Sequence, residues 1–152
     1  CPSPPPLAPP SPPLAPPSPP LAPPSKQPGS TFTSKGSLKK AVKAFHKKPA
    51  KAEEKYGPIA GWDVSGITDM SELFKLLKNF NADISNWNTS GVTDMRSIFE
   101  LATAFNADIS NWDTSGVTNM IGMFAQASAF NQPLSFDTSS VTNMADMFIV
   151  RC

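Results

Sequence analysis

The sequence has few of the residues that catalytic and metal-binding sites usually contain. Its only histidine is His46, and its two cysteines, Cys1 and Cys152, are the first and last of its 152 residues. This excludes an internal disulfide framework and a Cys/His zinc spacing. The sequence also shows no nucleophile–base pair, no metal-ligand cluster and no phosphate-binding loop. We therefore expect a protein that is not an enzyme and that needs no cofactor or metal ion.

Long apolar runs are also missing. No stretch approaches the ~18 residues that a transmembrane helix requires, and no signal-peptide pattern is present. The sequence does not begin with methionine, and it ends in "NMADMFIVRC". We interpret it as a mature form or a fragment, and we expect no transmembrane segment in it.

Charge is distributed unevenly, although the formal net charge is only +1. Residues 26–56 contain nine lysines and two glutamates, whereas residues 57–152 contain four basic and ten acidic side chains. The basic segment would support weak, salt-sensitive binding to anionic surfaces. No interleaved aromatic residues or recognition motif accompany the lysines. We therefore expect a solvated helix face and no specific nucleic-acid partner.

Proline is concentrated at the N-terminus. Fourteen of the eighteen prolines lie in the first 24 residues, where "SPPLAPP" recurs. Because proline fixes φ and donates no hydrogen bond, we predict a disordered polyproline II arm and linker over residues 1–30. A stiff spacer is the simplest role. Two others stay open: docking on SH3-type grooves, and similarity to the hydroxyproline-rich spacers of plant and algal wall glycoproteins.

The basic segment has the spacing of helices. In "SLKKAVKAFHKK", Leu38, Ala41, Val42 and Phe45 fall on one helical face, and Ser37 is a plausible N-cap. Pro49 suits the first turn of a second short helix, which the following Gly-Pro pair would end. We predict a basic helical cap over residues 31–58.

A repeat occupies residues 59–152. Trp62, Trp87 and Trp112 are spaced by 25 residues, and Phe136 follows after 24. The sequence thus contains three full repeats and a truncated fourth, and a period of this size indicates a solenoid. The predicted repeat core consists of Trp62, Trp87, Trp112, Phe136, Phe74, Phe99, Phe124 and Phe148.

Each repeat has segments that favour a helix and a strand. Met70, Leu73, Phe74 and Leu77 follow helical spacing, and the equivalent positions of later repeats do the same. The asparagine after each of these segments would supply a left-handed helix exit. "DISNW" favours a short strand, stacked in parallel from repeat to repeat. We therefore predict an α/β solenoid, a leucine-rich-repeat-like stack of short parallel strands and helices.

A four-residue polar cluster follows each tryptophan, and the first of these clusters is "DVSG" at residues 63–66. Aspartate or asparagine first and glycine fourth is the preference of a type I β-turn. A catalytic site needs one set of residues that differs from the equivalent positions of the other repeats, whereas a structural turn must recur in every repeat. We interpret the cluster as a corner. The alternative is a cation bound along the aspartate column, which Asn88 interrupts.

The pattern W-D-x-S-x-V-T-[ND]-M-x-x-[MLI]-F, followed by F-N-x-x-[IL]-S, resembles the short-repeat class of BspA-like leucine-rich-repeat surface proteins. Such repeats occur in bacterial surface lipoproteins and in many proteins of unicellular algae. The resemblance covers residues 59–152. It implies an open α/β solenoid and a role in surface display, adhesion or protein binding, and it supplies no catalytic residues.

The leading hypothesis is therefore an extracellular or cell-surface adhesion or protein-binding module on a stiff proline-rich spacer. Its ligand would be a protein or a glycan, and Ser85, Asn86, Ser110 and Asn111 form the candidate binding face. The uncapped C-terminal repeat would favour self-association. One alternative is a cell-wall structural glycoprotein, in which Asn88 of the sequon "NTS" carries an N-glycan. The other is an intracellular scaffold with a proline-rich docking arm.

Overall fold

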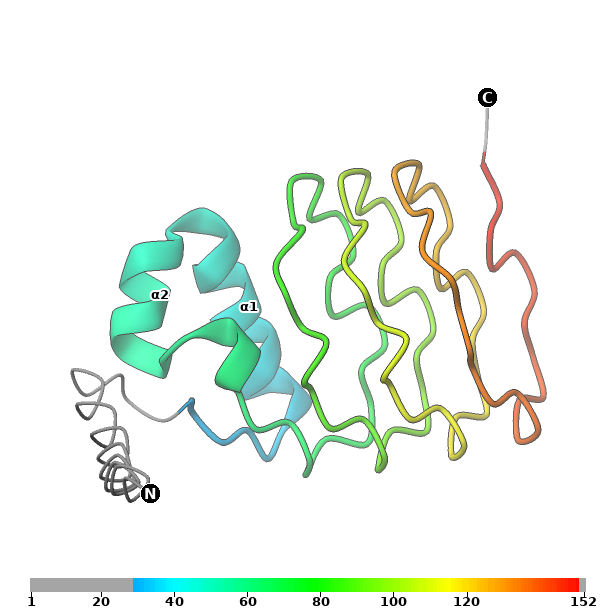
Figure 1. Cartoon of the computed structure of the whole chain (residues 1–152), viewed down its shortest axis with the longest axis horizontal. Helices are drawn as coiled ribbons and strands as arrows, with labels where there is room; N and C mark the ends of the chain where they lie inside the picture. The colour runs from blue at the N-terminus through cyan, green and yellow to red at the C-terminus, as the bar shows by residue number, and fades with distance from the viewer. Residues whose placement is uncertain (1–28, 151–152) are drawn as a thin grey trace, which may run out of the picture.

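The computed structural model describes residues 29–150, so nearly all of the predicted proline-rich arm lies outside the described residues. A helical cap begins the described part and contains α1 (Lys35–Lys47) and α2 (Pro49–Tyr56). The short 3-10 helix η1 (Ile59–Gly61) follows. The repeats then lie side by side as irregular coils, with the cap at one end (Figure 1).

The cap forms for the reasons that the sequence indicates, with one correction. The N-cap of α1 is Ser34, whose hydroxyl oxygen accepts a hydrogen bond from the N–H of Ser37, the predicted cap. Leu38, Ala41 and Val42 are buried on one face of α1. The cap closes the N-terminal end of the stack, where Phe45 lies 6.2 Å from Trp62 between ring centroids.

The predicted α/β solenoid is wrong. Residues 29–150 contain no β-strand, and their only helices are α1, α2 and η1. Where we predicted a repeat helix, the chain forms two tandem four-residue turns. The N–H of Leu73 donates to the carbonyl of Met70 at 3.2 Å, and the N–H of Leu77 donates to that of Phe74 at 3.1 Å. Tandem turns place residues at positions i, i+3, i+4 and i+7 on one side, and a helix does the same.

Backbone hydrogen bonds between repeats explain why turns form in place of a helix. The N–H groups of Met70 and Phe74 donate to carbonyls of the next repeat, those of Asp94 and Ile98, at 2.9 Å each. A helix that began at Met70 would need the N–H of Phe74 for the carbonyl of Met70, four residues earlier. The third residue of each turn also has a positive φ, for example 58° at Glu72, which interrupts a right-handed helix.

The "DISNW" segment is not a strand. The parallel bridges between repeats are isolated, and they join Asp69, Asp94, Asn119 and Asn143 on another side of the coil. On the "DISNW" side the tryptophans connect the repeats. The indole Nε1–H of Trp112 donates to the carbonyl of Ile84 at 3.0 Å. The carbonyl therefore receives a side-chain donor, and no backbone ladder is made there.

The asparagine at the end of each turn segment also has another role than predicted. Asn81, Asn106 and Asn131 are not among the residues with positive φ. Instead, Oδ1 of Asn81 accepts from the N–H of Asn106 at 2.8 Å, and Asn106 accepts from Asn131 in the same way, also at 2.8 Å. These residues form a side-chain ladder between repeats.

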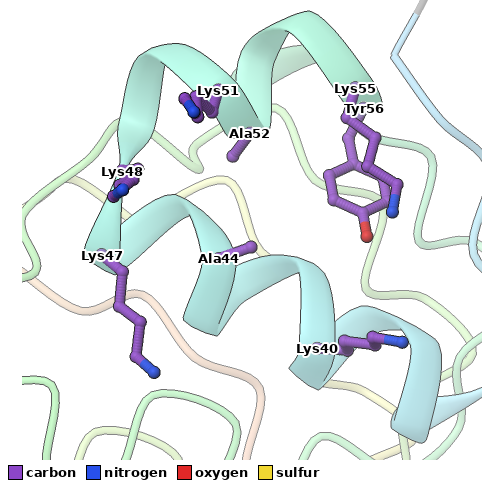
Figure 2. Close-up of a pocket in the computed structure, with 8 residues that line it drawn as sticks. All are labelled: Lys40, Ala44, Lys47, Lys48, Lys51, Ala52, Lys55 and Tyr56. Carbon is purple, nitrogen blue, oxygen red and sulfur yellow. The ribbon is translucent and has the colours of Figure 1, made fainter.

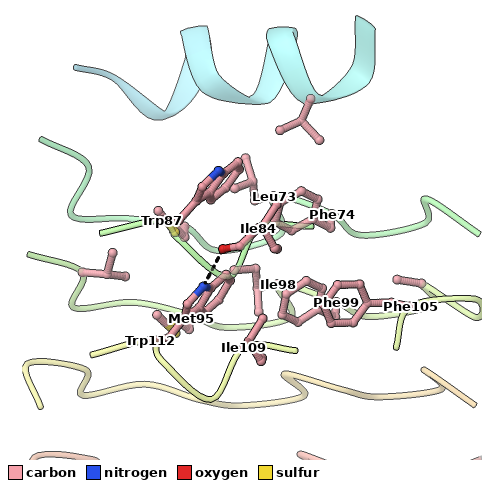
Figure 3. Close-up of a cluster of buried hydrophobic side chains, with 14 of the residues drawn as sticks. Leu73, Phe74, Ile84, Trp87, Met95, Ile98, Phe99, Phe105, Ile109 and Trp112 are labelled. Atoms are coloured by element: carbon pink, nitrogen blue, oxygen red, sulfur yellow. Dashed lines mark hydrogen bonds between the residues drawn. The ribbon is translucent and has the colours of Figure 1, made fainter. Parts of the chain in front are cut away.

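The core is a set of aromatic columns that run along the stack (Figure 3). Phe99 stacks between Phe74 and Phe124, with centroid distances of 5.3 and 5.5 Å. It also stacks on Phe105 of its own repeat at 3.9 Å, and Trp112 lies 5.8 Å away. Each repeat therefore buries its aromatic side chains against its neighbours, as expected for a repeat unit that cannot form a core alone.

Candidate functional site

The polar cluster after each tryptophan is a corner that satisfies its own polar groups. Oδ1 of Asp63 accepts from the N–H and the hydroxyl of Ser65 at 3.0 and 2.6 Å. Asn88 and Asp113 make the same pair of bonds to the serine two residues later. The turn covers residues 64–67, one residue later than predicted. It is closed by the N–H of Ile67, which donates to the carbonyl of Val64 at 2.9 Å.

These hydrogen bonds keep the corner aspartates charged. The hydroxyl of Ser115, and then its N–H, lower the pKa of the Asp113 carboxyl, because both donate to its ionised form. Ser65 lowers the pKa of Asp63 for the same reason. Across residues 29–150, no group of three or more histidine, cysteine, aspartate or glutamate side chains is placed to hold a metal ion.

The candidate binding face recurs in two successive repeats. Asn86 and Asn111 are exposed at equivalent positions, and each directly precedes a buried tryptophan. Ser85 and Ser110 are half-buried. The hydroxyl of Ser85 donates to Oδ1 of Asp83 at 2.6 Å, so this serine shapes the loop. The groups of this face that remain open to a ligand are mainly the two asparagine amides.

Two aspartates that the sequence pattern did not point to, Asp83 and Asp108, also belong to this face. Their side-chain oxygens accept from the N–H groups of Ser85 and Ser110 at 3.0 and 2.9 Å. The Ser85 hydroxyl, and then its N–H, lower the pKa of Asp83. The signal was present in the sequence, since aspartate two residues before serine is typical of an Asx-turn. We define the polar face as Asp83, Ser85 and Asn86 with Asp108, Ser110 and Asn111.

The candidate glycosylation residue, Asn88, is exposed at a corner. Its Oδ1 accepts from the N–H and the hydroxyl of Ser90 at 3.1 and 2.7 Å. The middle residue of the sequon, Thr89, is buried, and its hydroxyl donates to the carbonyl of Asp113 at 3.0 Å. The sequon therefore presents its asparagine outward and uses its threonine to join two repeats.

The predicted core residues fall into two groups. Trp62, Trp87, Trp112, Phe74, Phe99 and Phe124 are buried. Phe136 is only half-buried. Its side chain has no N–H, so it cannot donate to a backbone carbonyl of the preceding repeat as the tryptophan indoles do. Phe148 is 58% exposed, and Met144, Ile149 and Val150 are exposed beside it. The last described repeat thus presents an apolar end.

Backbone N–H groups join each repeat to the next one, and the last described repeat has the equivalent groups. In the third repeat the N–H groups of Met120 and Phe124 donate to carbonyls of the fourth, those of Asn143 and Met147. The equivalent N–H groups of the fourth repeat belong to Met144 and Phe148. This end therefore resembles the surface on which each inner repeat receives the next one.

Comparison with known proteins supports the repeat assignment. Residues 39–150 match the family described as "Mycoplasma protein of unknown function, DUF285", which is the BspA-like repeat family. The match does not extend to the proline-rich residues. No curated protein and no solved structure matches the chain. Among the described residues, no helix has the length and apolar character needed to cross a membrane. On the strength of a match that spans most of its length, the chain belongs to the BspA-like repeat family.

Proposed function

We propose that the chain is a non-enzymatic, surface-displayed repeat protein that binds a protein or glycan ligand through the polar face. Its family suggests a surface repeat protein and leaves the activity of such proteins unknown. The observation that carries the proposal is the recurrence of one polar triad in two successive repeats, at positions 83–86 and 108–111. A triad that recurs in two neighbouring repeats of a regular stack presents the same groups twice to one ligand.

The geometry of the stack supports recognition of an extended ligand. Phe74 and Phe99 of neighbouring repeats lie 5.3 Å apart between ring centroids. Asn86 and Asn111 occupy equivalent positions of these two neighbouring repeats, so their exposed amides lie on the same side of the stack. The Asx-turns fix the loops that carry these amides, which reduces the entropy lost on binding. The two sets of weak contacts with one extended ligand would then add up by multivalency.

The charge of the face favours particular ligands. Asp83 and Asp108 have lowered pKa values, chiefly because Ser85 and Ser110 donate to their carboxylates, so both are ionised at neutral pH. A ligand with basic groups or many hydrogen-bond donors suits such a surface. A protein segment with exposed lysines or arginines meets this condition, and so does a glycan rich in hydroxyl groups.

The experiment compares two doubly substituted variants of equal charge. In the test variant, Asn86→Lys and Asn111→Lys place bulk and positive charge on the polar face. In the control, Asn79→Lys and Ala104→Lys make equivalent changes in the same two repeats, at another position. Each protein is applied to an immobilised panel of glycans and extracellular-matrix proteins. We expect binding by the unchanged protein and the control, and a loss of about tenfold or more in the test variant.

Two results would refute the proposal. If the unchanged protein binds nothing on the panel and surface labelling of producing cells does not reach it, a surface adhesion role is wrong. If both variants lose binding equally, the interaction depends on overall charge and the polar face is not its site.

A structural glycoprotein of the cell wall is the second candidate, and exposed Asn88 is the observation that favours it. Mass spectrometry of the Asn88 peptide and of the proline-rich peptide, from protein isolated from its native cells, distinguishes the candidates. An N-glycan at Asn88 together with hydroxyproline glycans supports the wall protein. Unmodified peptides remove this candidate and leave the binding module.

A further inference from the structure

The helical cap contains a groove that the polar face does not involve. It lies between α1 and α2, has a volume of about 350 Å³, and is open to solvent. Ala44 and Ala52 line its middle, and Tyr56 lies at one end (Figure 2). Five lysines also line it: Lys40, Lys47, Lys48, Lys51 and Lys55. Small apolar side chains thus form the floor, and cationic side chains surround them.

The charge of this groove is not compensated within the cap. The ion pairs among residues 29–150 use Lys35, Lys75 and Arg96, and none of them uses a lysine of the groove. The only acidic residues of α1 and α2 are Glu53 and Glu54, and neither lines the groove. Five cations around one concavity raise the local concentration of anions and accelerate their encounter.

The groove also has a specific apolar component. The aliphatic stems of lysines cover apolar surface while their ammonium groups stay in water. Lys55 Nζ lies 5.1 Å from the ring centroid of Tyr56, a cation–π contact that holds one side of the groove. A ligand that fills this space needs an apolar group for the alanine floor and anionic groups for the lysines on either side.

We propose that the groove binds an acidic peptide segment that inserts an apolar side chain between α1 and α2. Charge complementarity identifies this occupant, since an apolar residue flanked by carboxylates matches the floor and the lysines together. A flat anionic bilayer would meet the lysines but not the floor between the helices. Single-stranded nucleic acid would need a series of stacking aromatics, and the groove has only Tyr56. The proposal is independent of the polar face, which belongs to different residues.

The probe is a fluorescein-labelled peptide with one leucine and one phenylalanine between two runs of glutamates. Its binding to the full chain is measured by fluorescence anisotropy over a range of salt concentrations. The control peptide has serine at both apolar positions. We expect the probe to bind at least about fivefold more tightly than the control peptide, because only the probe fills the apolar floor. We also expect added salt to weaken the binding of both peptides.

Two charge-neutralising variants provide a matched comparison. Lys47→Gln with Lys51→Gln removes two lysines of the groove. Lys39→Gln with Lys43→Gln removes two lysines of α1 that do not line it, with the same change in net charge. We expect the first variant to bind the probe about tenfold more weakly, since each solvated ion pair contributes about threefold. The second variant should change binding by less than about twofold.

A third variant, Ala44→Leu, fills the floor and leaves all lysines in place. It should remove the difference between the probe and the control peptide while the control peptide still binds. Helical circular dichroism of each variant establishes that the cap is folded. The proposal is wrong if the two lysine variants weaken binding equally, or if the probe and control peptides bind the unchanged protein equally.

Competition distinguishes other occupants. Vesicles of phosphatidylcholine and phosphatidylserine, a synthetic peptide of residues 1–24, and excess unlabelled full chain are each tested against the bound probe. Failure of all three to displace the probe supports a separate acidic partner. Displacement by one of them at a lower concentration than the unlabelled probe requires would overturn the proposal and assign the groove to a membrane, to the N-terminal segment or to a second copy. A negative adhesion panel would leave this outcome unchanged.

Discussion

Replacement of Phe99 by alanine should be among the most destabilising single changes in the repeats. Phe99 is fully buried and contacts four aromatic side chains: Phe74 at 5.3 Å, Phe105 at 3.9 Å, Phe124 at 5.5 Å and Trp112 at 5.8 Å. Its removal leaves a cavity between two repeats and interrupts an aromatic column. The cost of Phe→Ala in a core is about 3–5 kcal/mol, and the four partners place this site near the upper value.

The chain contains its own control for this substitution. Phe148 occupies the equivalent position of the fourth repeat, but it is 58% exposed, and its one aromatic partner among residues 29–150 is Phe124, at 5.4 Å. Less than half of its surface is removed from water, so Phe148→Ala should cost about 1 kcal/mol. The two substitutions are chemically identical, and we expect them to differ by about 2–4 kcal/mol.

Urea denaturation followed by tryptophan fluorescence measures this difference, because Trp62, Trp87 and Trp112 are buried in the same core. With a slope of about 2 kcal/mol per molar urea, Phe99→Ala should lower the midpoint by about 2 M and Phe148→Ala by about 0.5 M. Circular dichroism should give the same midpoints if the cap and the repeats unfold together. Equal shifts for the two variants would refute the aromatic stacking argument.

Other substitutions test separate features. Trp112→Phe removes the N–H that donates to the carbonyl of Ile84 at 3.0 Å, and it should lower the unfolding free energy by about 1–3 kcal/mol in urea titrations. Gly122→Ala should cost about 1 kcal/mol in thermal unfolding, because φ is 59° and the new Cβ would lie 3.3 Å from a serine hydroxyl. The pKa of Asp113 lies below the usual 3.8, chiefly because the Ser115 hydroxyl donates to the ionised carboxyl. The ionised carboxyl therefore stabilises the fold above pH 3.8, and this contribution is lost as the pH falls through the folded-state pKa. Asp113→Asn removes the charge and should therefore slightly lower the stability at pH 7 and reduce the loss of stability in acid titrations. Unchanged acid sensitivity would contradict the assignment. The exposed apolar side chains of Met144, Phe148 and Val150 predict self-association of this chain at tens of micromolar in sedimentation velocity, and Phe148→Lys should shift the chain toward monomer.

Part of the polar face was readable in the sequence. Asn86 and Asn111 stand at equal repeat positions before a tryptophan, so they had to share one side of a regular stack. Asp83 and Asp108 were not assigned to the face, although their spacing from serine is that of an Asx-turn. The groove between α1 and α2 was not visible at all, because a lysine on a helix gives the same pattern whether it lies beside a concavity or on a flat surface.

The sequence by itself determined the repeat period, the two cap helices and most of the side chains that are buried. A 25-residue period places equivalent residues above one another, so Phe74 and Phe99 had to share a column in any stacked arrangement. Pro49 and Gly57 also fixed where α2 begins and ends, through their backbone preferences.

Only the tertiary structure decided the backbone conformation inside each repeat. The spacing of Met70, Leu73, Phe74 and Leu77 fits a helix and two tandem turns equally well, because both bring these positions to one side. The N–H of Phe74 donates to the carbonyl of Ile98 in the next repeat at 2.9 Å, and this bond is absent from an isolated repeat. Local periodicity cannot distinguish a hydrogen bond to the same segment from one to a residue 24 positions later, and that long-range choice replaced the predicted helix and strand with turns.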